Sequence, residues 1–201
     1  RGFGKDAILG CGYGMGAAKF LLRCLANEVL RPMFDSGEYD EAFVKRLVKT
    51  YRSKYSLIPE FWSAVERAWR VATRYGREET VGRLKFWHAD GTTYMRLPSG
   101  RTMMYHHARV CSDDRLHYMS GNEHHDLWGG SITENIVQAT CRDYLAGWIL
   151  QIERDTRKPV VHHVYDETIT MVPEASVETY RQQIEAIMSS GPEWADDMPF
   201  A

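Results

Sequence analysis

The 201-residue sequence lacks several features that would assign it to particular classes of protein. It has no apolar run of the roughly eighteen residues that a membrane-spanning helix needs, and no segment patterned like a secretion signal. Its four cysteines form no CxxC pair and no disulfide framework; they are Cys11, Cys24, Cys111 and Cys141. We therefore expect a soluble cytoplasmic protein with reduced thiols, no structural zinc and no membrane partner.

A strong excess of either charge is also missing, but the net charge of −2 hides an asymmetry. Residues 1–110 carry 19 Lys and Arg against 11 Asp and Glu, a net +8, whereas residues 111–201 carry 6 against 16, a net −10. A basic half suits a polyanion, and an acidic half suits divalent cations or simple solubility. With 44% hydrophobic residues the chain can bury a core, either as one domain or as part of a larger protein.

The hydrophobic periodicity predicts an α+β fold. Helices are predicted over residues 17–30, ending at Arg31-Pro32, and over 41–55, 59–75, 131–154 and 174–190. Strands are predicted over 81–88, 92–97 and 102–110, as an antiparallel meander, and over 160–164 and 168–172, as a hairpin. Asp90-Gly91 supplies a hairpin turn, a capping box at Ser131 opens the long helix, and the acidic tail beyond Gly191 is expected to be solvated.

The start of the chain places four residues at a spacing of four, followed by Gly14; they are Arg1, Lys5, Leu9 and Tyr13. On a helix this spacing gives one face that carries two cations, then an apolar residue, then an aromatic ring. Such a face suits a triphosphate at one end and a base at the other. Three alternatives stay open: the dense glycines favour a loop, the face can be merely solvated, and residues 12–17 fit a loose dinucleotide fingerprint that lacks its preceding strand.

A second group of candidate residues lies at the tip of the predicted hairpin 160–172. Asp166 and Glu167 would project from a short turn between two buried strands, and magnesium prefers hard oxygen ligands that are held rigidly. Acidic turn tips are often only solvated. Phosphate-binding cations together with carboxylates for a metal are, however, the two halves of a phosphoryl-transfer site.

Two further patterns are less specific. A basic run along the helix 41–55 could follow the phosphates of a nucleic acid, or could be a solvated face; it comprises Lys45, Arg46, Lys49, Arg52 and Lys54. The histidine pairs at 106–107, 124–125 and 162–163 resemble metal ligands, but adjacent residues point to different sides of a strand. Surface or primer-side roles fit them better than zinc.

Four segments in the same order resemble the family A DNA polymerases, the DNA polymerase I group. The spaced motif from Arg1 to Gly14 is similar to the family's fingers-helix motif, and residues 97–101, Leu-Pro-Ser-Gly-Arg, resemble a segment of its bacteriophage members. Residues 128–138 resemble a palm helix, and residues 163–167 resemble the last palm motif. The resemblance covers nearly the whole chain and implies part of a right-hand fold: a fingers-type helical region over residues 1–80 and a palm-type α+β region over residues 81–201.

The resemblance implies roles for individual residues in template-directed transfer of a deoxynucleotidyl group to a primer 3′ end. Arg1 and Lys5 would bind the phosphates of the nucleotide, and Leu9 would face the sugar. Lys5 would lie nearer the reacting phosphorus and act as a catalytic residue that protonates the departing pyrophosphate. Tyr13 would close over the nascent base pair with Gly14 leaving room beside it, and Asp166 would hold catalytic metal with Glu167 in support. DNA contacts are expected from Gly14, Gln138, Tyr165 and Arg101.

The sequence departs from the family at three positions: Leu9 stands where an aromatic residue is usual, Tyr165 where His is common, and Glu134 where many members have Asn. The first palm motif, which supplies another metal-binding Asp, is expected upstream of Arg1, as are the thumb and any exonuclease. We therefore expect a fragment or split subunit that is inactive alone. Its partners would be primer-template DNA, deoxynucleoside triphosphates, two Mg²⁺ ions and the missing N-terminal portion, in the host cytoplasm if it is viral.

Two other functions remain as alternatives to a polymerase. A non-catalytic nucleic-acid-binding module would keep the basic face without performing chemistry. A dinucleotide-dependent oxidoreductase would use the glycine-rich segment at residues 12–17.

Overall fold

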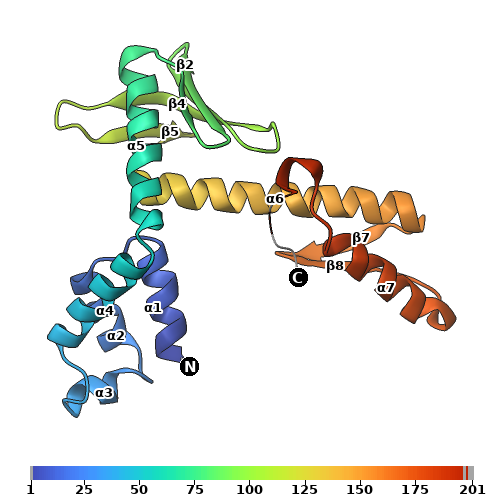
Figure 1. Ribbon diagram of the computed structural model, residues 1–201, viewed down its shortest axis with the longest axis horizontal. Coiled ribbons are helices and arrows are strands. Elements are labelled where there is room, and N and C mark those ends of the chain that lie inside the picture. The colour runs from blue at the N-terminus through green and yellow to red at the C-terminus, as the bar shows by residue number, and fades with distance from the viewer. Residues whose placement is uncertain (1, 197, 199–201) are drawn as a thin grey trace. The chain divides into compact units, whose positions relative to one another are not determined.

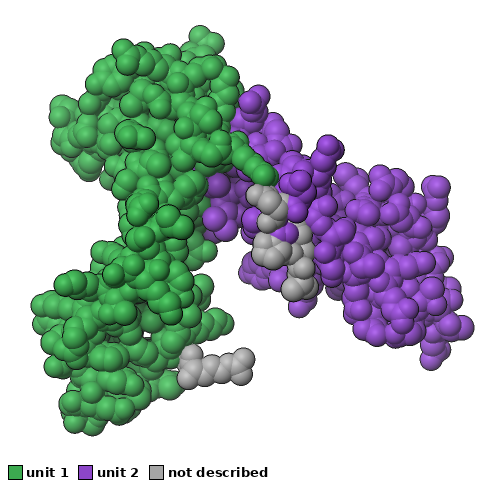
Figure 2. Space-filling model, viewed as in Figure 1, with its two compact units in different colours: residues 1–94, 104–135 green, residues 95–103, 136–201 purple. Residues whose placement is uncertain are grey.

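The computed structural model describes residues 2–196 and 198 (Figure 1). The protein is α+β, with an antiparallel sheet packed with helices, as the sequence predicts. It divides into two compact units, Arg1–Tyr94 with Met104–Asn135, and Met95–Met103 with Ile136–Ala201 (Figure 2). The expected division into fingers and palm regions at residue 80 stays a prediction. Among the described residues, no helix is both long and apolar enough to cross a membrane.

The first unit begins with four helices around a small core. They are α1 (Gly2–Gly12), α2 (Ala17–Ala26), α3 (Arg31–Asp35) and α4 (Glu41–Lys54). The glycine-dense start is therefore a helix rather than a loop. The fully buried side chains of the core that the four helices share include Phe20, Cys24 and Val44. The ring of Tyr39 stacks on Phe43 at 4.4 Å between centroids. This apolar packing offsets the low helix propensity of the glycines in α1.

The predicted helix 17–30 is confirmed over its first ten residues and wrong over its last four. α2 ends at Ala26, and the side-chain oxygen of Asn27 accepts hydrogen bonds from the amides of Val29 and Leu30 at 2.9 and 3.3 Å. This local bonding gives the backbone an alternative to another helical turn. Pro32, expected to stop a helix, instead lies in the first turn of α3, where a missing amide hydrogen costs nothing.

Helix α5 (Leu57–Tyr75) confirms the predicted helix 59–75 and extends from the helical end of the unit to its sheet (Figure 1). Trp62, Val65 and Trp69 are buried along one side, as the helical spacing predicts. The helix ends at Gly76, whose φ of +62° is the left-handed conformation that glycine adopts without strain.

A six-stranded sheet with the strands in sequence order confirms the meander. Its strands are β1 (Glu79–Val81), β2 (Leu84–Ala89), β3 (Thr92–Arg96), β4 (Thr102–Val110), β5 (Leu116–Ser120) and β6 (Glu123–Leu127). Asp90 and Gly91 both have positive φ, 48° and 72°, as a type I′ hairpin turn requires. The predicted strand 81–88 is confirmed from Leu84 onward as β2, but its start is wrong, because Gly82, with φ of +56°, turns the chain between β1 and β2. Strands β5 and β6 were not predicted, since their histidines and acids interrupt the apolar alternation.

Helix α6 (Gly129–Thr156) is the long predicted helix, but it begins two residues earlier than expected. The hydroxyl of Ser131 accepts a hydrogen bond from the amide of Trp128 at 3.0 Å, so Ser131 lies in the first turn and not at the cap. The predicted capping box is therefore wrong. An apolar stripe from Val137 to Ile152 was expected to be buried on this helix; Tyr144, Leu145 and Ile152 are buried, whereas Val137 and Cys141 are exposed.

The second unit contains most of α6, the hairpin β7 (Val160–Val164) and β8 (Glu167–Thr170), and α7 (Val177–Met188), with short 3₁₀ turns η1 (Glu174–Ser176) and η2 (Glu193–Ala195). The predicted hairpin is confirmed, but most of its residues are exposed, so the expectation of two buried strands is wrong. The tail is not wholly solvated either. Trp194 stacks on Tyr144 of α6 at 4.6 Å, and Ala195 is buried.

Candidate functional site

A pocket of about 430 Å³ opens at the turn between α1 and α2, where three residues of the predicted site meet. Tyr13 and Trp128 give it two aromatic rings that are 45% and 42% exposed, and Lys19 and Arg23 supply positive charge. Its lining consists of Leu9, Gly10, Tyr13, Gly14, Met15, Gly16, Lys19, Arg23 and Trp128. Aromatic faces together with cations suit a ligand that has a flat ring and an anionic group.

The turn that carries Tyr13 is a Schellman motif. The amide of Met15 donates to the carbonyl of Gly10 at 2.9 Å, and the amide of Gly14 donates to the carbonyl of Cys11 at 3.1 Å. Gly14 has a φ of +77°, a conformation that a residue with a side chain adopts only with strain. The glycine is therefore needed to end α1 and to place Tyr13 at the mouth of the pocket.

Trp128 lies against the backbone of this turn and was not among the residues predicted for the site. A Cβ added to Gly14 would lie 2.0 Å from Cη2 of Trp128, and one added to Gly130 would lie 2.2 Å from the same atom. Only glycine at these two positions leaves space for the indole ring. The pair Gly129-Gly130 directly after a tryptophan was the sequence signal for this close approach.

The first turn of α6 holds Trp128 in place. The amide of Gly129 donates to Oε2 of Glu66 on α5 at 2.7 Å, and a Cβ on Gly129 would lie 2.2 Å from the carbonyl oxygen of Trp62. The rings of Trp62 and Trp128 meet edge to face, with centroids 5.6 Å apart. A carboxylate at a helix N-terminus is favoured by the helix dipole, so Glu66 caps α6 from a neighbouring helix.

The charges near the pocket are partly paired within the first unit. Arg23 Nη2 lies 3.1 Å from Oδ1 of Asp6, and Arg52 Nη2 donates to the carbonyl of Gly14 at 3.4 Å.

Burial raises the pKa of the Cys11 thiol, which keeps it protonated and unsuited to be a nucleophile. Lys5 is exposed on α1, one turn before Leu9, and Arg1 lies outside the described residues.

The predicted metal ligands lie in the second unit, at the tip of the hairpin. Tyr165 and Asp166 form the two-residue turn, Tyr165 has a φ of 52°, and Glu167 begins β8 opposite Val164. All three side chains are exposed, and Tyr165 is 91% exposed. Carboxylate oxygens suit magnesium, but no group of three or more His, Cys, Asp or Glu that could hold a metal occurs within residues 2–196 and 198. Asp166 and Glu167 therefore fit a magnesium site in the type of ligand, as one or two carboxylates that act together with waters and substrate phosphates.

Arg101 binds α6 within the second unit. Its Nε lies 2.5 Å from Oδ1 of Asp143, and its Nη2 donates to the carbonyl of Ala139 at 2.8 Å. The hydroxyl of Ser99 donates to the other oxygen of the same carboxylate. These bonds hold the turn 97–101 against α6. Ala139, whose carbonyl accepts one of them, directly follows the exposed Gln138. The DNA contacts expected from Arg101 and Gln138 stay predictions.

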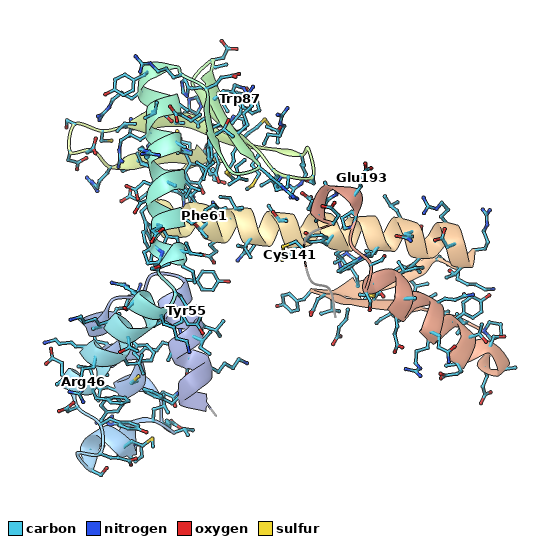
Figure 3. All side chains as sticks on the ribbon, in the orientation of Figure 1. Arg46, Tyr55, Phe61, Trp87, Cys141 and Glu193 are labelled. Atoms are coloured by element: carbon cyan, nitrogen blue, oxygen red, sulfur yellow. The ribbon has the colours of Figure 1, made fainter. Side chains whose placement is uncertain are left out.

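The basic run on α4 is largely exposed, and Arg46 projects from this helix (Figure 3). Lys45 forms an ion pair with Glu41 at 2.6 Å. Arg52 differs from the exposed cations of the run, because its guanidinium donates to the carbonyl of Gly14. Among the histidine pairs, His106, His107, His162 and His163 are exposed. These observations leave α4 as a candidate polyanion surface and give no support to a zinc site.

Comparison with known proteins shows similarity to a viral enzyme. The chain is 32% identical over 208 residues to the DNA polymerase of Bacillus phage SP02; the match covers 98% of this chain and 30% of that polymerase. No protein-family profile matches the chain, and no solved structure matches it. The chain thus spans about a third of the length of its relative, and the similarity supports homology to that part of a phage DNA polymerase.

Proposed function

We propose that this chain forms the part of a DNA polymerase that binds the incoming deoxynucleotide and the primer end, with a family A architecture of fingers and palm. The observation that carries the proposal is the similarity of almost the whole chain to one third of a phage DNA polymerase. The pocket at Leu9 and Tyr13 supports it from the geometry, since the residues predicted to face the sugar and the base line one cavity.

The residues divide into three roles. Arg1 and Lys5 bind the phosphates of the nucleotide. Lys5 is exposed one helical turn before Leu9, which lines the pocket. Tyr13 packs over the nascent base pair, and Gln138 and Tyr165 contact the primer end. Arg101 supports this contact by holding the turn 97–101 against α6.

Asp166 holds magnesium in this proposal, and Glu167 supports it. Bound magnesium would stabilise the charge that develops on the attacking and leaving oxygens of the phosphoryl transfer. Two carboxylates are too few for two ions with a combined charge of about +4, so further ligands come from another part of the polymerase. We therefore propose that these 201 residues do not extend a primer without that part.

A hybrid enzyme tests this proposal. The matched third of the phage SP02 DNA polymerase is replaced by this chain, and extension of a labelled primer is followed with magnesium and deoxynucleotides. Extension is expected from the hybrid and not from the isolated chain. Asp166→Asn should abolish extension while leaving DNA binding unchanged. The matched control, Asp196→Asn, changes an exposed acid of the same unit and should retain extension.

Two results would contradict the proposal. Robust extension by the isolated chain would show that its own residues complete the metal site. A folded hybrid that binds primer-template DNA without extending it would favour the non-catalytic nucleic-acid-binding module.

A further inference from the structure

We propose that Trp128 is a positioning residue for the nucleotide pocket: its indole fixes the Tyr13–Gly14 turn and thereby sets the place of the Tyr13 ring. This inference rests on the proposed function, because it names a residue that prepares the same pocket. The resemblance implies a role for Gln138 in the segment 128–138 and none for Trp128. Trp128 acts through the turn and takes no part in the transfer itself.

The first step of the argument is the closeness of the indole to the turn. An added Cβ on Gly14 would meet three atoms of the six-membered ring, Cη2, Cζ2 and Cζ3, at 2.0, 2.9 and 3.0 Å. The ring therefore contacts the α-carbon of Gly14 directly. Gly14 is the residue whose positive φ closes the Schellman motif, so the indole contacts the point that decides the direction of the turn.

The second step is that Trp128 is itself held from several sides. The hydroxyl of Ser131 bonds both the amide and the carbonyl of Trp128, at 3.0 and 2.9 Å. The edge of the ring also approaches Gly130, and Trp62 packs against it edge to face. Glu66 holds the next residue, Gly129, by a hydrogen bond of 2.7 Å. The indole is thus fixed to α5 and to the first turn of α6.

The third step connects this rigid group with the ligand. Tyr13 directly precedes Gly14, and both Tyr13 and Trp128 line the pocket. Removal of the indole would leave the α-carbon of Gly14 without its packing partner, so the turn could adopt other conformations. Binding a nucleotide would then require ordering of the turn, and this entropic cost lowers affinity.

The experiment uses the full 201-residue chain with Trp128→Ala and the conservative Trp128→Phe. Amide hydrogen exchange is measured residue by residue, and affinity is measured with a fluorescent N-methylanthraniloyl deoxyadenosine triphosphate. The matched control is Trp87→Ala, which removes a tryptophan stacked on Tyr94 at 5.1 Å in the sheet and outside the pocket (Figure 3).

In Trp128→Ala we expect exchange at the amides of Gly14 and Met15 to accelerate at least about tenfold, with less than about threefold change in α5. The dissociation constant of the fluorescent nucleotide should rise about tenfold. Trp128→Phe should restore most of both properties, because a six-membered ring remains. Trp87→Ala should change neither.

Unchanged exchange at Gly14 and Met15 in Trp128→Ala would overturn the proposal. So would a loosened turn with unaltered nucleotide affinity, because Trp128 would then be only a structural residue. Failure of the proposed function is recognised separately, by the absence of nucleotide binding to the unmodified chain and of extension by the hybrid enzyme.

Discussion

Gly130 and Trp128 are in such close contact that no larger residue fits at position 130. An added Cβ would lie 2.2, 2.3 and 2.7 Å from three ring atoms of Trp128, distances that real side chains do not reach. The backbone of Gly130 has no positive φ, so the restriction is steric and comes from the indole alone. This separates the contact from the requirement at Gly14, where the backbone conformation also demands glycine.

Gly130→Ala should therefore lower the free energy of unfolding by about 2 kcal/mol, the usual cost of overpacking. In a Trp128→Ala background the same change should be neutral, or stabilising by up to about 1 kcal/mol, because alanine favours a helix over glycine. Urea denaturation of the four chains measures this coupling. Gly147→Ala is the control: it lies in the same helix with open space around it and should stabilise both backgrounds equally. Equal costs of Gly130→Ala in the two backgrounds would disprove the steric explanation.

The cap supplied by Glu66 can be tested by two substitutions. Glu66→Ala removes the acceptor for the amide of Gly129 and the partner of Arg70, whose Nη2 lies 2.8 Å from the carboxylate. We expect it to lower the free energy of unfolding by about 2 kcal/mol, and Glu66→Gln, which keeps an acceptor, by about 1 kcal/mol. Glu60→Ala, in an exposed position of the same helix, should change it by less than about 0.5 kcal/mol. Equal losses for Glu66 and Glu60 would show that the cap contributes little.

The ion pair of Arg101 and Asp143 should contribute to stability whether or not Arg101 contacts DNA. Asp143 is only 12% exposed and accepts from both Arg101 and Ser99. Arg101→Ala and Asp143→Ala should each lower the free energy of unfolding by about 1–2 kcal/mol, and the double variant by much less than the sum. The exposed pair Arg154 and Asp155 is the control, with an expected coupling below about 0.5 kcal/mol. Additive losses at Arg101 and Asp143 would mean that the two residues act independently.

Tyr105 should make stability depend on pH in the alkaline range. Burial raises its pKa from 10 to about 12, while a hydrogen bond with Asn135 lowers it slightly. Folding favours the neutral phenol, so this contribution is complete below pH 10 and is lost as the pH rises from 10 to 12, by about 2–3 kcal/mol in total. The difference in unfolding free energy between the wild type and Tyr105→Phe, measured from pH 8 to 12, isolates this residue. A difference that does not change with pH would contradict the prediction.

Several elements could be predicted from the sequence because their causes are local. The apolar spacing of α5, the left-handed glycine that ends it and the Asp90-Gly91 turn each depend on residues close together in the chain. The hairpin that carries Asp166 was predicted for the same reason. Its strands were wrongly expected to be buried, because burial depends on which other segments cover them.

The errors in the prediction have physical causes too. Strands β5 and β6 contain charged and histidine residues that hide their alternation, and their pairing with each other stabilises them nonetheless. Asn27 ends α2 through its own side chain, a competing bond that apolar spacing does not reveal. In the candidate site, the sequence identified Leu9, Tyr13 and Gly14 and missed Trp128, which is more than a hundred residues away along the chain.

The sequence by itself determined the local chemistry of this protein: a helix with its residues spaced by four, a turn that needs glycine, and a hairpin with carboxylates at its tip. Only the tertiary structure decided that the indole of Trp128 lies on Gly14, that Glu66 caps α6 and that Arg101 is bound to Asp143. The reason is that periodicity and turn propensity act over a few residues, whereas close packing and ion pairs depend on which distant surfaces meet when the chain folds.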